Sequence, residues 1–298
     1  MKFVINEEQI GLRLDVLLSN LTELSRSKIS TLVKEGDILV NETKVKNGYI
    51  TKLNDEILIK YEEKEMKAVP EKMDLDIVYE DDDVIVVNKA NGVVVHPAAG
   101  NYTGTLVNGL LYHAKNLSNI NGEFRPGIVH RIDADTTGLL MVAKNNKAHE
   151  ILAKQLEEKT THRIYYALVW GNINNDTGTI DAPIGRDPKD RKKMAVTPDN
   201  SKNAVTHFKV LERYKNATLI ELKLETGRTH QIRVHMKYIG HPVVNDPVYL
   251  NKNLFDETGQ CLHAKELGFI HPKTGEYMHF TSELPECFVN IQNILKNE

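Results

Sequence analysis

The 298-residue sequence predicts an α+β fold in two parts: a small α/β domain, then a larger domain on a mainly antiparallel mixed sheet with flanking helices. Three observations support this fold class. Apolar residues recur at helical spacing in some segments and at strand spacing in others. The strands and helices follow no regular β–α–β cycle, as a parallel sheet would require. A charged stretch at residues 62–76, poor in large apolar side chains, predicts a linker between domains at 1–61 and 77–298.

The N-terminal part predicts two helices followed by two short strands. The first helix depends on four leucines at helical spacing, which are Leu14, Leu17, Leu18 and Leu21. The second helix begins after Ser25, a residue suited to cap a helix N-terminus, and ends at Gly36. The segments DILVN (37–41) and DEILIKY (55–61) predict the strands.

The larger part predicts four strand-forming segments, of which the first folds back around an acidic turn. These segments are residues 77–89, 138–144, 163–171 and 217–227. Residues 147–158 predict a helix, because their large apolar residues repeat on one helical face. A further helix follows Thr229, a candidate N-cap, and stops at Gly240, just before Pro242.

Composition and charge narrow the class of protein. With 41% hydrophobic and 27% charged residues, the chain predicts a globular protein. Its two cysteines, Cys261 and Cys287, fit neither a disulfide framework nor a zinc spacing, which favours a reducing compartment. The N-terminus does not resemble a signal peptide and the apolar runs are too short to span a bilayer, so we expect a cytoplasmic protein without a membrane partner. The net charge of −3 leaves nucleic-acid binding open, because a local basic patch is enough to bind phosphates.

The sequence contains none of the common cofactor signatures. There is no GxGxxG turn after a strand and no phosphate-binding loop. His230 and His235 are five residues apart, which places them on different faces of either a helix or a strand, so they cannot share a metal ion. The sequence therefore predicts neither a metal nor an organic cofactor. Acid, base and nucleophile chemistry by ordinary side chains remains.

The segment HRIDADTTG, residues 130–138, concentrates charge directly before an apolar strand. A solvated turn would explain the pattern, with Asp135 capping the backbone of the residues that follow. An active site would also explain it, with a carboxylate that an arginine holds in place. Asp133 follows Arg131 and precedes the turn proper, so both interpretations stay open for its carboxylate.

The segment LETGRTHQIRVH, residues 224–235, favours the active-site interpretation. Arg228 and Arg233 lie at a predicted strand-to-helix junction, where Gly227 allows a close approach of the backbone. An arginine at such a junction can hold a carboxylate in a two-pronged pair. That pair keeps the carboxylate ionised, as a nucleophile or a base requires. A structural salt bridge is the alternative interpretation.

Two further motifs have more than one interpretation. Tyr165 and Tyr166 are neighbours on a predicted strand and therefore face opposite sides. One is suited to the core and the other to stacking on a planar substrate or moving a proton, and alternation does not say which. A cation-rich loop either stays solvated or contacts phosphates as a mobile arm. Its basic residues are Arg186, Lys189, Arg191, Lys192 and Lys193.

Four segments, in order, resemble the motifs of the RluA-type pseudouridine synthases. GIVHRIDADTTGLLMVAK is similar to the family's central motif, and YEDDDVIVVNKANGVVVHP is similar to its first motif. RIYYALVWG resembles its K/R-x-Y-x-A strand, and LETGRTHQIRVHMKYIGHPVVNDPVY resembles its C-terminal motif. The first sixty residues resemble the small α-L RNA-binding domain that precedes many of these enzymes. Three positions differ from the usual pattern: Ala90 replaces a proline, Asn245 replaces a glycine and Thr137 replaces a serine.

The resemblance implies isomerisation of uridine to pseudouridine in RNA, mostly large-subunit ribosomal RNA, without a cofactor. It places the catalytic aspartate on Asp133, its arginine partner on Arg233 and the substrate-stacking tyrosine on Tyr165. Arg131 corresponds to the arginine that fills the space left by a flipped-out base. We expect a monomer. Other residues expected to contact substrate or RNA are His130, Thr137, Arg228, Lys89, Arg26 and Lys28.

Two other classes of protein remain as alternatives. An RNA-binding assembly factor with this fold would bind RNA without turning it over. A nucleoside or glycoside hydrolase would need a second catalytic carboxylate, for which Asp135 is the nearby candidate, and would release free uracil. Even within the synthase prediction, Asp133 has two possible roles: attack on the ribose anomeric carbon, or removal of the ribose 2′ proton.

Overall fold

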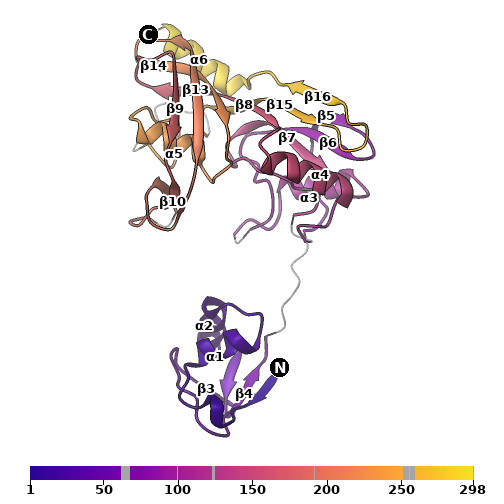
Figure 1. Cartoon of the computed structure of the whole chain (residues 1–298), viewed down its shortest axis with the longest axis vertical. Coiled ribbons are helices and arrows are strands. Elements are labelled where there is room, and N and C mark those ends of the chain that lie inside the picture. Colours follow the sequence, from indigo (N-terminus) through magenta and orange to yellow (C-terminus); the bar gives the residue numbers. More distant parts are fainter. Residues whose placement is uncertain are drawn as a thin grey trace. The chain divides into compact units, whose positions relative to one another are not determined.

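The computed structural model divides into two compact units, Met1–Glu65 and Met66–Glu298 (Figure 1). Each unit has its own hydrophobic core. Within the described ranges, no helix is both long and apolar enough to cross a membrane. The ranges that the structure describes are residues 1–61, 68–98, 100–122, 125–190, 192–250, 255 and 259–297.

The smaller unit packs two helices and a four-stranded antiparallel sheet around one core. Helices α1 (Leu14–Leu21) and α2 (Arg26–Glu35) confirm the predicted pair. Helix α2 is capped as expected, because the Ser25 side chain accepts a hydrogen bond from the Lys28 amide and Gly36 adopts a left-handed φ of 86°. The sheet order is β1-β4-β2-β3, with bounds Lys2–Val4, Glu56–Ile59, Ile38–Val40 and Thr43–Lys44, and a short 3-10 helix spans Glu7–Gln9.

The larger unit is built on a nine-stranded sheet, counted over the described residues, in the order β5-β6-β7-β15-β8-β14-β13-β9, with β16 paired to β15. Only the contact between β7 and β15 is parallel among the pairings of these strands, so the predicted mainly antiparallel sheet is confirmed. The strands span Asp76–Glu80, Val84–Lys89, Thr137–Ala143, Leu262–Ile270, His162–Trp170, Ala217–Leu224, Val205–Arg213, Thr177–Asp181 and Tyr277–Thr281. A smaller sheet joins β10 (Ile184–Arg186) to β11 (Met194–Val196) and β12 (Ser201–Lys202).

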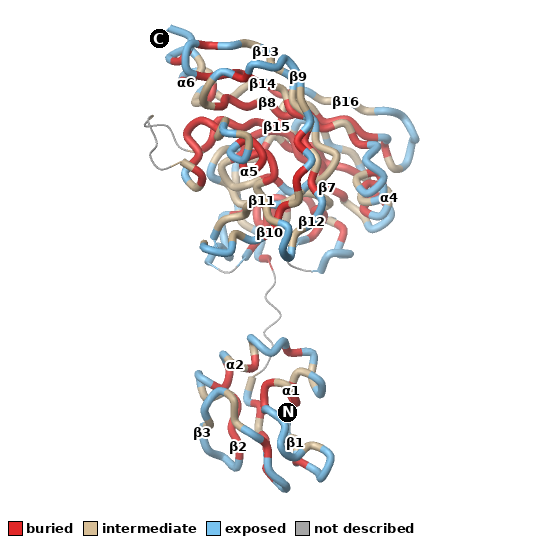
Figure 2. The backbone as a smooth tube through the Cα atoms, turned by 60° about the vertical axis from the view of Figure 1, so that its left-hand side comes forward, coloured by how far each residue is buried: buried red, intermediate tan, exposed pale blue. Residues whose placement is uncertain are grey.

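Helices cover this sheet because its strands are apolar on both faces. Strand β7 is buried at every position (Figure 2). Its residues Leu140 and Val142 share a core with α3 (Leu106–His113) and α5 (Gln231–Tyr238), whereas Leu139 and Met141 pack with α4 (Asn146–Glu157). Helix α6 (Glu286–Asn297) packs on β14 near the C-terminus (Figure 1).

The predicted helix after Thr229 is confirmed, but its N-cap is wrong. Helix α5 begins at Gln231, and the capping position is His230, in a left-handed conformation with φ 56° and ψ 21°. Its side chain makes no capping hydrogen bond. Helix ends commonly shift by a residue from a sequence pattern. Here the residue at the capping position is a histidine that lies close to the functional site described below.

The predicted linker at 62–76 lies partly outside the described residues, because 62–67 are not described. The described residues that follow, 68–76, belong to the larger unit. Ala68 belongs to its core, the Glu71 amide donates to the Asn108 carbonyl, and the Asn108 side chain donates to the Val69 carbonyl.

The cation-rich loop connects β10 to β11. The amides of Lys189 and Asp190 donate to the Asp187 carboxylate, and the Lys193 ammonium lies 3.7 Å from Asp190. Lys189 and Lys192 are exposed. Arg191 lies outside the described residues, and contact of this loop with phosphates stays a prediction.

Gly138 allows the parallel pairing that supports the HRIDADTTG segment. It has a φ of +108°, and a Cβ atom there would clash with the Ala264 carbonyl oxygen and lie 2.7 Å from the Ala264 nitrogen. We expect Gly138→Ala to lower the free energy of unfolding by more than about 3 kcal/mol. Gly240→Ala, with a φ of +86° but nothing within 4 Å, should lower it by about 1 to 2 kcal/mol. Urea unfolding followed through the single tryptophan, Trp170, measures both; equal losses would contradict the steric argument.

Candidate functional site

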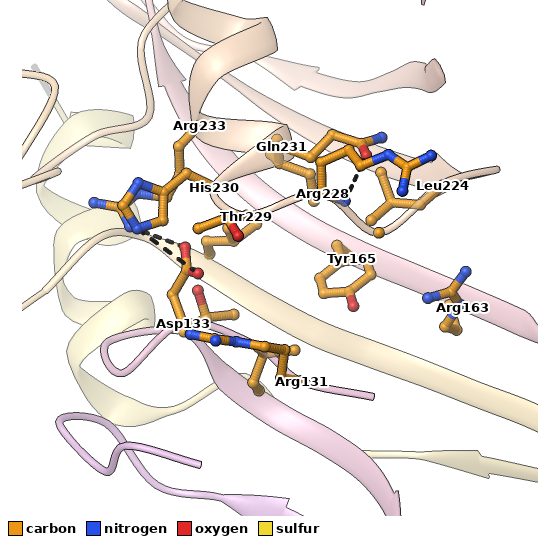
Figure 3. A pocket seen from close by; sticks show the side chains of 15 residues that line it. Arg131, Asp133, Arg163, Tyr165, Leu224, Arg228, Thr229, His230, Gln231 and Arg233 are labelled. Carbon is orange, nitrogen blue, oxygen red and sulfur yellow. Dashed lines mark hydrogen bonds and ion pairs between the residues drawn. The ribbon is translucent and has the colours of Figure 1, made fainter. Parts of the chain in front are cut away.

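One pocket of the larger unit collects charged residues from three parts of the chain (Figure 3). They come from the loop before β7, from β8, and from the connection between β14 and α5 with the first turn of α5. The pocket has about 560 Å³ of empty space, part of it open to solvent, which suits a small ligand or one nucleotide. Its polar lining includes Arg131, Asp133, Arg163, Tyr165, Arg228, His230 and Arg233.

Arg233 lies between two carboxylates. Its NH1 donates to Asp133 Oδ2 at 2.9 Å, and its Nε and NH2 donate to the two oxygens of Asp246 at 2.7 and 2.8 Å. Arg233 is 3% exposed and Asp246 is fully buried, whereas Asp133 reaches the pocket. Burial opposes the charge of Arg233, but the hydrogen bonds and charges of Asp246 and Asp133 outweigh it and raise the pKa of the guanidinium. Arg233 therefore stays cationic and fixes the direction of the Asp133 carboxylate.

Asp246 is itself held by a turn. Its Oδ1 accepts hydrogen bonds from the amides of Val248 and Tyr249 at 2.9 and 3.0 Å. Asn245, the residue before it, has a left-handed φ of 59°. Asparagine tolerates this conformation better than most residues, which explains why it can stand where glycine is usual. The turn fixes Asp246, and Asp246 in turn fixes Arg233.

His230 and Tyr249 surround the ion pair. The Nδ1 atom of His230 lies 2.9 Å from the Tyr249 hydroxyl, and its Nε2 lies 4.0 Å from Asp133 Oδ1. The Arg233 guanidinium lies over the Tyr249 ring, 5.2 Å from its centroid. Burial lowers the pKa of His230, so a neutral imidazole lies beside Asp133 at neutral pH.

The Gln231 side chain anchors the loop that leads into α5 through four hydrogen bonds. Its Oε1 accepts hydrogen bonds from the Thr226 hydroxyl and the Arg228 amide, and its Nε2 donates to the Val205 carbonyl and the Thr206 hydroxyl. All four bonds are between 2.7 and 3.0 Å. This network ties the loop to β13 and holds Arg228 at the pocket.

Tyr165 lines the pocket, whereas Tyr166 lies on the other face of β8. Tyr165 is 6% exposed, and burial raises the pKa of its phenol. The phenol is therefore protonated at neutral pH. Tyr165 offers the pocket a flat, uncharged ring.

Lys89 and His130 lie behind the pocket and hold the loop before β7. The buried Lys89 ammonium donates to the carbonyls of Ala90 and Ala134 at 2.7 and 2.6 Å. Burial lowers its pKa to about 7, although Asp135 and Asp133 act in the opposite direction. His130 Nε2 accepts a hydrogen bond from the Met141 amide on β7. Burial, with the charge of Arg163, lowers the pKa of His130 to about 3.

Two groups of side chains have the composition and closeness needed to hold a cation. They are His162, Glu266 and His279, and Asp81, Asp83 and His271. In the first group both imidazoles already contact the Glu266 carboxylate, at 3.2 and 3.1 Å. Neither group lines the pocket that contains Asp133.

Comparison with known proteins supplies the family. A family model described as RNA pseudouridylate synthase matches residues 83–238, and one described as S4 domain matches residues 12–57. The chain is 56% identical to an uncharacterized RNA pseudouridine synthase of Bacillus subtilis, over 98% of this chain and 97% of that protein. It is 47% identical to ribosomal large subunit pseudouridine synthase D of Neisseria meningitidis, over 98% of this chain and 80% of that protein.

The chain belongs to the RNA pseudouridylate synthase family. It is an RNA pseudouridine synthase, an isomerase that converts uridine to pseudouridine, as the sequence motifs predicted. The predicted fold class is confirmed by a solved human structure, RNA pseudouridylate synthase domain containing 1. That structure superposes on this synthase with a TM-score of 0.59 at 27% identity, over 76% of this chain and 96% of its own.

The structure brings together five of the residues that the sequence singled out. Arg131, Asp133, Tyr165, Arg228 and Arg233 line one pocket of the synthase, although they come from segments up to about a hundred residues apart. This arrangement follows from the sheet, because β7 and β8 both neighbour β15. The roles given to these residues remain predictions.

The other singled-out residues lie elsewhere. Lys89 and His130 lie beneath the loop, and Thr137 Oγ1 is buried 2.7 Å from His263 Nδ1. In the smaller unit, Arg26 pairs with Asp15 at 2.9 Å. Also in that unit, the Lys28 ammonium lies 4.3 Å from the Tyr61 ring centroid. Asp135 was expected to cap the backbone after it, but the amide of Thr136 instead donates to the Asp133 carbonyl.

Sequence reasoning missed the residues that position the ion pair. These are Asp246, Tyr249, His230 and Gln231. Arg163, which lines the pocket without contacting the pair, was missed as well. One signal was available: Asp246 precedes Pro247 in VVNDPVY, and an aspartate before a proline is typical of a turn. Nothing in the sequence connects that turn to Arg233.

The buried neutral state of His130 predicts a pH dependence of stability. The folded synthase does not protonate His130 until about pH 3, whereas the unfolded chain does so below about 6.5. Stability is therefore present above about pH 6.5 and is lost as the pH falls toward 3, by at most about 1.4 kcal/mol per pH unit from this residue.

We expect His130→Gln to reduce this loss, because Gln Oε1 can still accept from the Met141 amide. Urea midpoints followed through Trp170 between pH 7 and 4.5 should fall less steeply in the variant than in the wild type. Equal slopes would contradict a buried, neutral His130.

Arg233 should not be replaceable by lysine. Arg233→Lys keeps the positive charge, but a single ammonium cannot reproduce three hydrogen bonds to two carboxylates. We expect pseudouridine formation to slow by at least about 100-fold, because the Asp133 carboxylate loses its fixed direction. Arg213→Lys is the matched control, since Arg213 forms an exposed pair with Asp176. An active Arg233→Lys variant would show that charge alone is sufficient.

Proposed function

We propose that this synthase modifies uridines of large-subunit ribosomal RNA, with Asp133 as the catalytic carboxylate acting on a flipped-out uridine. The observation that supports this most directly is the ion pair. Asp133 reaches the pocket, and Arg233, itself fixed by Asp246, holds one of its oxygens. A carboxylate held in this way has a fixed direction and is available to substrate, which suits a nucleophile or a base.

The reaction moves one bond and one proton. The bond between uracil N1 and ribose C1′ breaks, the uracil rotates, and C5 bonds to C1′. The proton on C5 leaves to solvent and N1 gains a proton, so atoms and electrons balance without a cofactor. Asp133 begins the reaction, either by bonding to C1′ or by removing the 2′ proton, and is released at the end.

Tyr165 and Arg131 act on the base in this proposal. The flat, protonated ring of Tyr165 lines the same pocket as Asp133, where it can stack on the uracil. Extruding a nucleotide from a folded RNA requires roughly a few kcal/mol. Arg131 is exposed beside Asp133 and can stack in the space that the uracil leaves, which offsets part of that free energy.

Large-subunit ribosomal RNA is the substrate suggested by the relatives. Several proteins at 39 to 47% identity over nearly the whole chain are named ribosomal large subunit pseudouridine synthase D. The smaller unit, which matches the S4 domain, offers phosphate contacts through cations such as the exposed Arg26 and the half-buried Lys28. Residues 1–61 would then bind RNA, while the larger unit performs the isomerisation.

The first experiment maps pseudouridine in ribosomal RNA from cells that lack this gene, using carbodiimide labelling and primer extension. We expect large-subunit sites to disappear, and the wild-type gene but not Asp133→Asn to restore them. Unchanged ribosomal RNA would overturn the proposed substrate. Restoration by Asp133→Asn would overturn the catalytic assignment.

Purified synthase should release tritium from large-subunit RNA labelled with [5-³H]uridine. We expect Asp133→Asn to lower the rate by at least about 1,000-fold, because an amide is neither a nucleophile nor a base. Asp135→Asn, two residues away, should stay within about tenfold of the wild type. Free uracil in the reaction would indicate a hydrolase instead, and tight binding without tritium release would indicate a binding factor.

A further inference from the structure

Arg163 is a buried arginine with no partner among the residues that the structure describes. It lies on β8, is 8% exposed, and its Nε makes no hydrogen bond. Among the described residues, no carboxylate lies within ion-pair distance of its guanidinium. Burying an unpaired charge is unfavourable, so a protein rarely keeps one unless something binds it. The proposed reaction does not use this residue.

The guanidinium of Arg163 faces the pocket and not the apolar core. Arg163 lines the pocket that contains Asp133 and Tyr165, and also a neighbouring hollow that reaches α4. In Figure 3, Tyr165 lies between Asp133 and Arg163. A Cβ atom on Gly227 would lie 3.6 Å from Arg163 NH1, so the guanidinium lies against an exposed loop glycine. It is therefore accessible to a ligand that enters over this loop.

The part of the pocket near Arg163 has more positive than negative charge. Asp133 already pairs with Arg233. Glu225, which lines the neighbouring hollow together with Arg163, is held by Lys159 at 3.0 Å and His207 at 2.8 Å. Arg131 and Arg228 line the same pocket as Arg163, and in the described part of the chain neither forms an ion pair. An anionic ligand would satisfy all three guanidinium groups.

We propose that Arg163, assisted by Arg131 and Arg228, binds a phosphodiester next to the target uridine. The inference rests on the proposed function, since it assumes a uridine whose ribose lies at Asp133 and whose uracil stacks on Tyr165. A guanidinium presents two parallel N–H donors that match two phosphate oxygens. Because Arg163 and Tyr165 are two residues apart on one strand, both side chains face the same nucleotide. Arg163 thus sets the position of the target along the RNA chain.

The first test separates binding from chemistry in the full-length synthase, using the tritium-labelled large-subunit RNA as the probe. We expect Arg163→Gln to raise KM by about 10- to 100-fold, the effect of losing a charged hydrogen-bonded contact, and to change kcat by less than about threefold. The slope of log Kd against log salt should fall by about one, as for one lost phosphate contact. Arg163→Lys should recover part of the binding.

Two further measurements exclude a purely structural role. Thermal unfolding of Arg163→Gln should match or exceed that of the wild type, because the substitution removes a buried charge that no protein group pairs with. Lys159→Gln is the matched control, since Lys159 is exposed and already paired with Glu225; its KM should stay near the wild-type value. An Arg163→Gln variant that unfolds earlier, or that keeps the wild-type KM and salt slope, would overturn the inference.

A second test replaces the phosphate itself. Two RNA fragments each carry one neutral methylphosphonate linkage, on the 5′ side of the target uridine in one and on the 3′ side in the other. One of the two should bind the wild type more weakly than the unmodified fragment, by the same factor as Arg163→Gln weakens binding. The Arg163→Gln variant should bind that fragment as tightly as it binds the unmodified fragment. If the substitution and the methylphosphonate each weaken binding and their effects multiply, Arg163 contacts another group, such as the uracil. If the wild type releases no tritium from any large-subunit fragment, the proposed function fails; if only the Arg163 effects are absent, this inference fails alone.

Discussion

The site depends on one shared arginine. Arg233 donates to Asp133 and, through two further hydrogen bonds, to the buried Asp246. An exposed arginine with one carboxylate would hold it loosely, because solvent and side-chain entropy weaken such a pair. Here the second carboxylate fixes the guanidinium first, and turn amides fix that carboxylate. The direction of Asp133 is therefore set by the packing of a helix and a turn from elsewhere in the chain.

The sheet holds the loop that contains Asp133 in place. The loop that contains Asp133 leads into β7, which pairs with β6 over its length and with β15 at Gly138. Lys89 at the end of β6 binds the loop carbonyl of Ala134, and His130 accepts from the β7 amide of Met141. Both groups are buried, and burial favours their uncharged forms. They stabilise the loop from outside the lining of the pocket.

Local features of the fold were predictable from sequence because nearest neighbours determine them. The cap at Ser25, the left-handed Gly36 and the two strands around the acidic turn all depend on interactions within a few residues. The same holds for the alternation that separates Tyr165 from Tyr166. The family motifs added the expected site residues, and the pocket contains five of them.

The sequence by itself determined the fold class, many of the elements and the family, since these depend on periodicity, capping and motif spacing. Helices α3 and α6 and strands such as β13 and β15 were not predicted. Alternation alone left the choice between Tyr165 and Tyr166 open, and the family motif assigned it to Tyr165, which lines the pocket. Only the tertiary structure decided which acid fixes Arg233. It also decided that Arg163 is buried with no ion-pair partner in the described ranges. Asp246 is thirteen residues from Arg233 and Asp133 is a hundred, and no local pattern encodes such contacts. A charge is paired or unpaired only once the whole chain has folded around it. The Asp133–Arg233 ion pair, and an Arg163 with no ion-pair partner in the described part of the chain, are therefore properties of the packing.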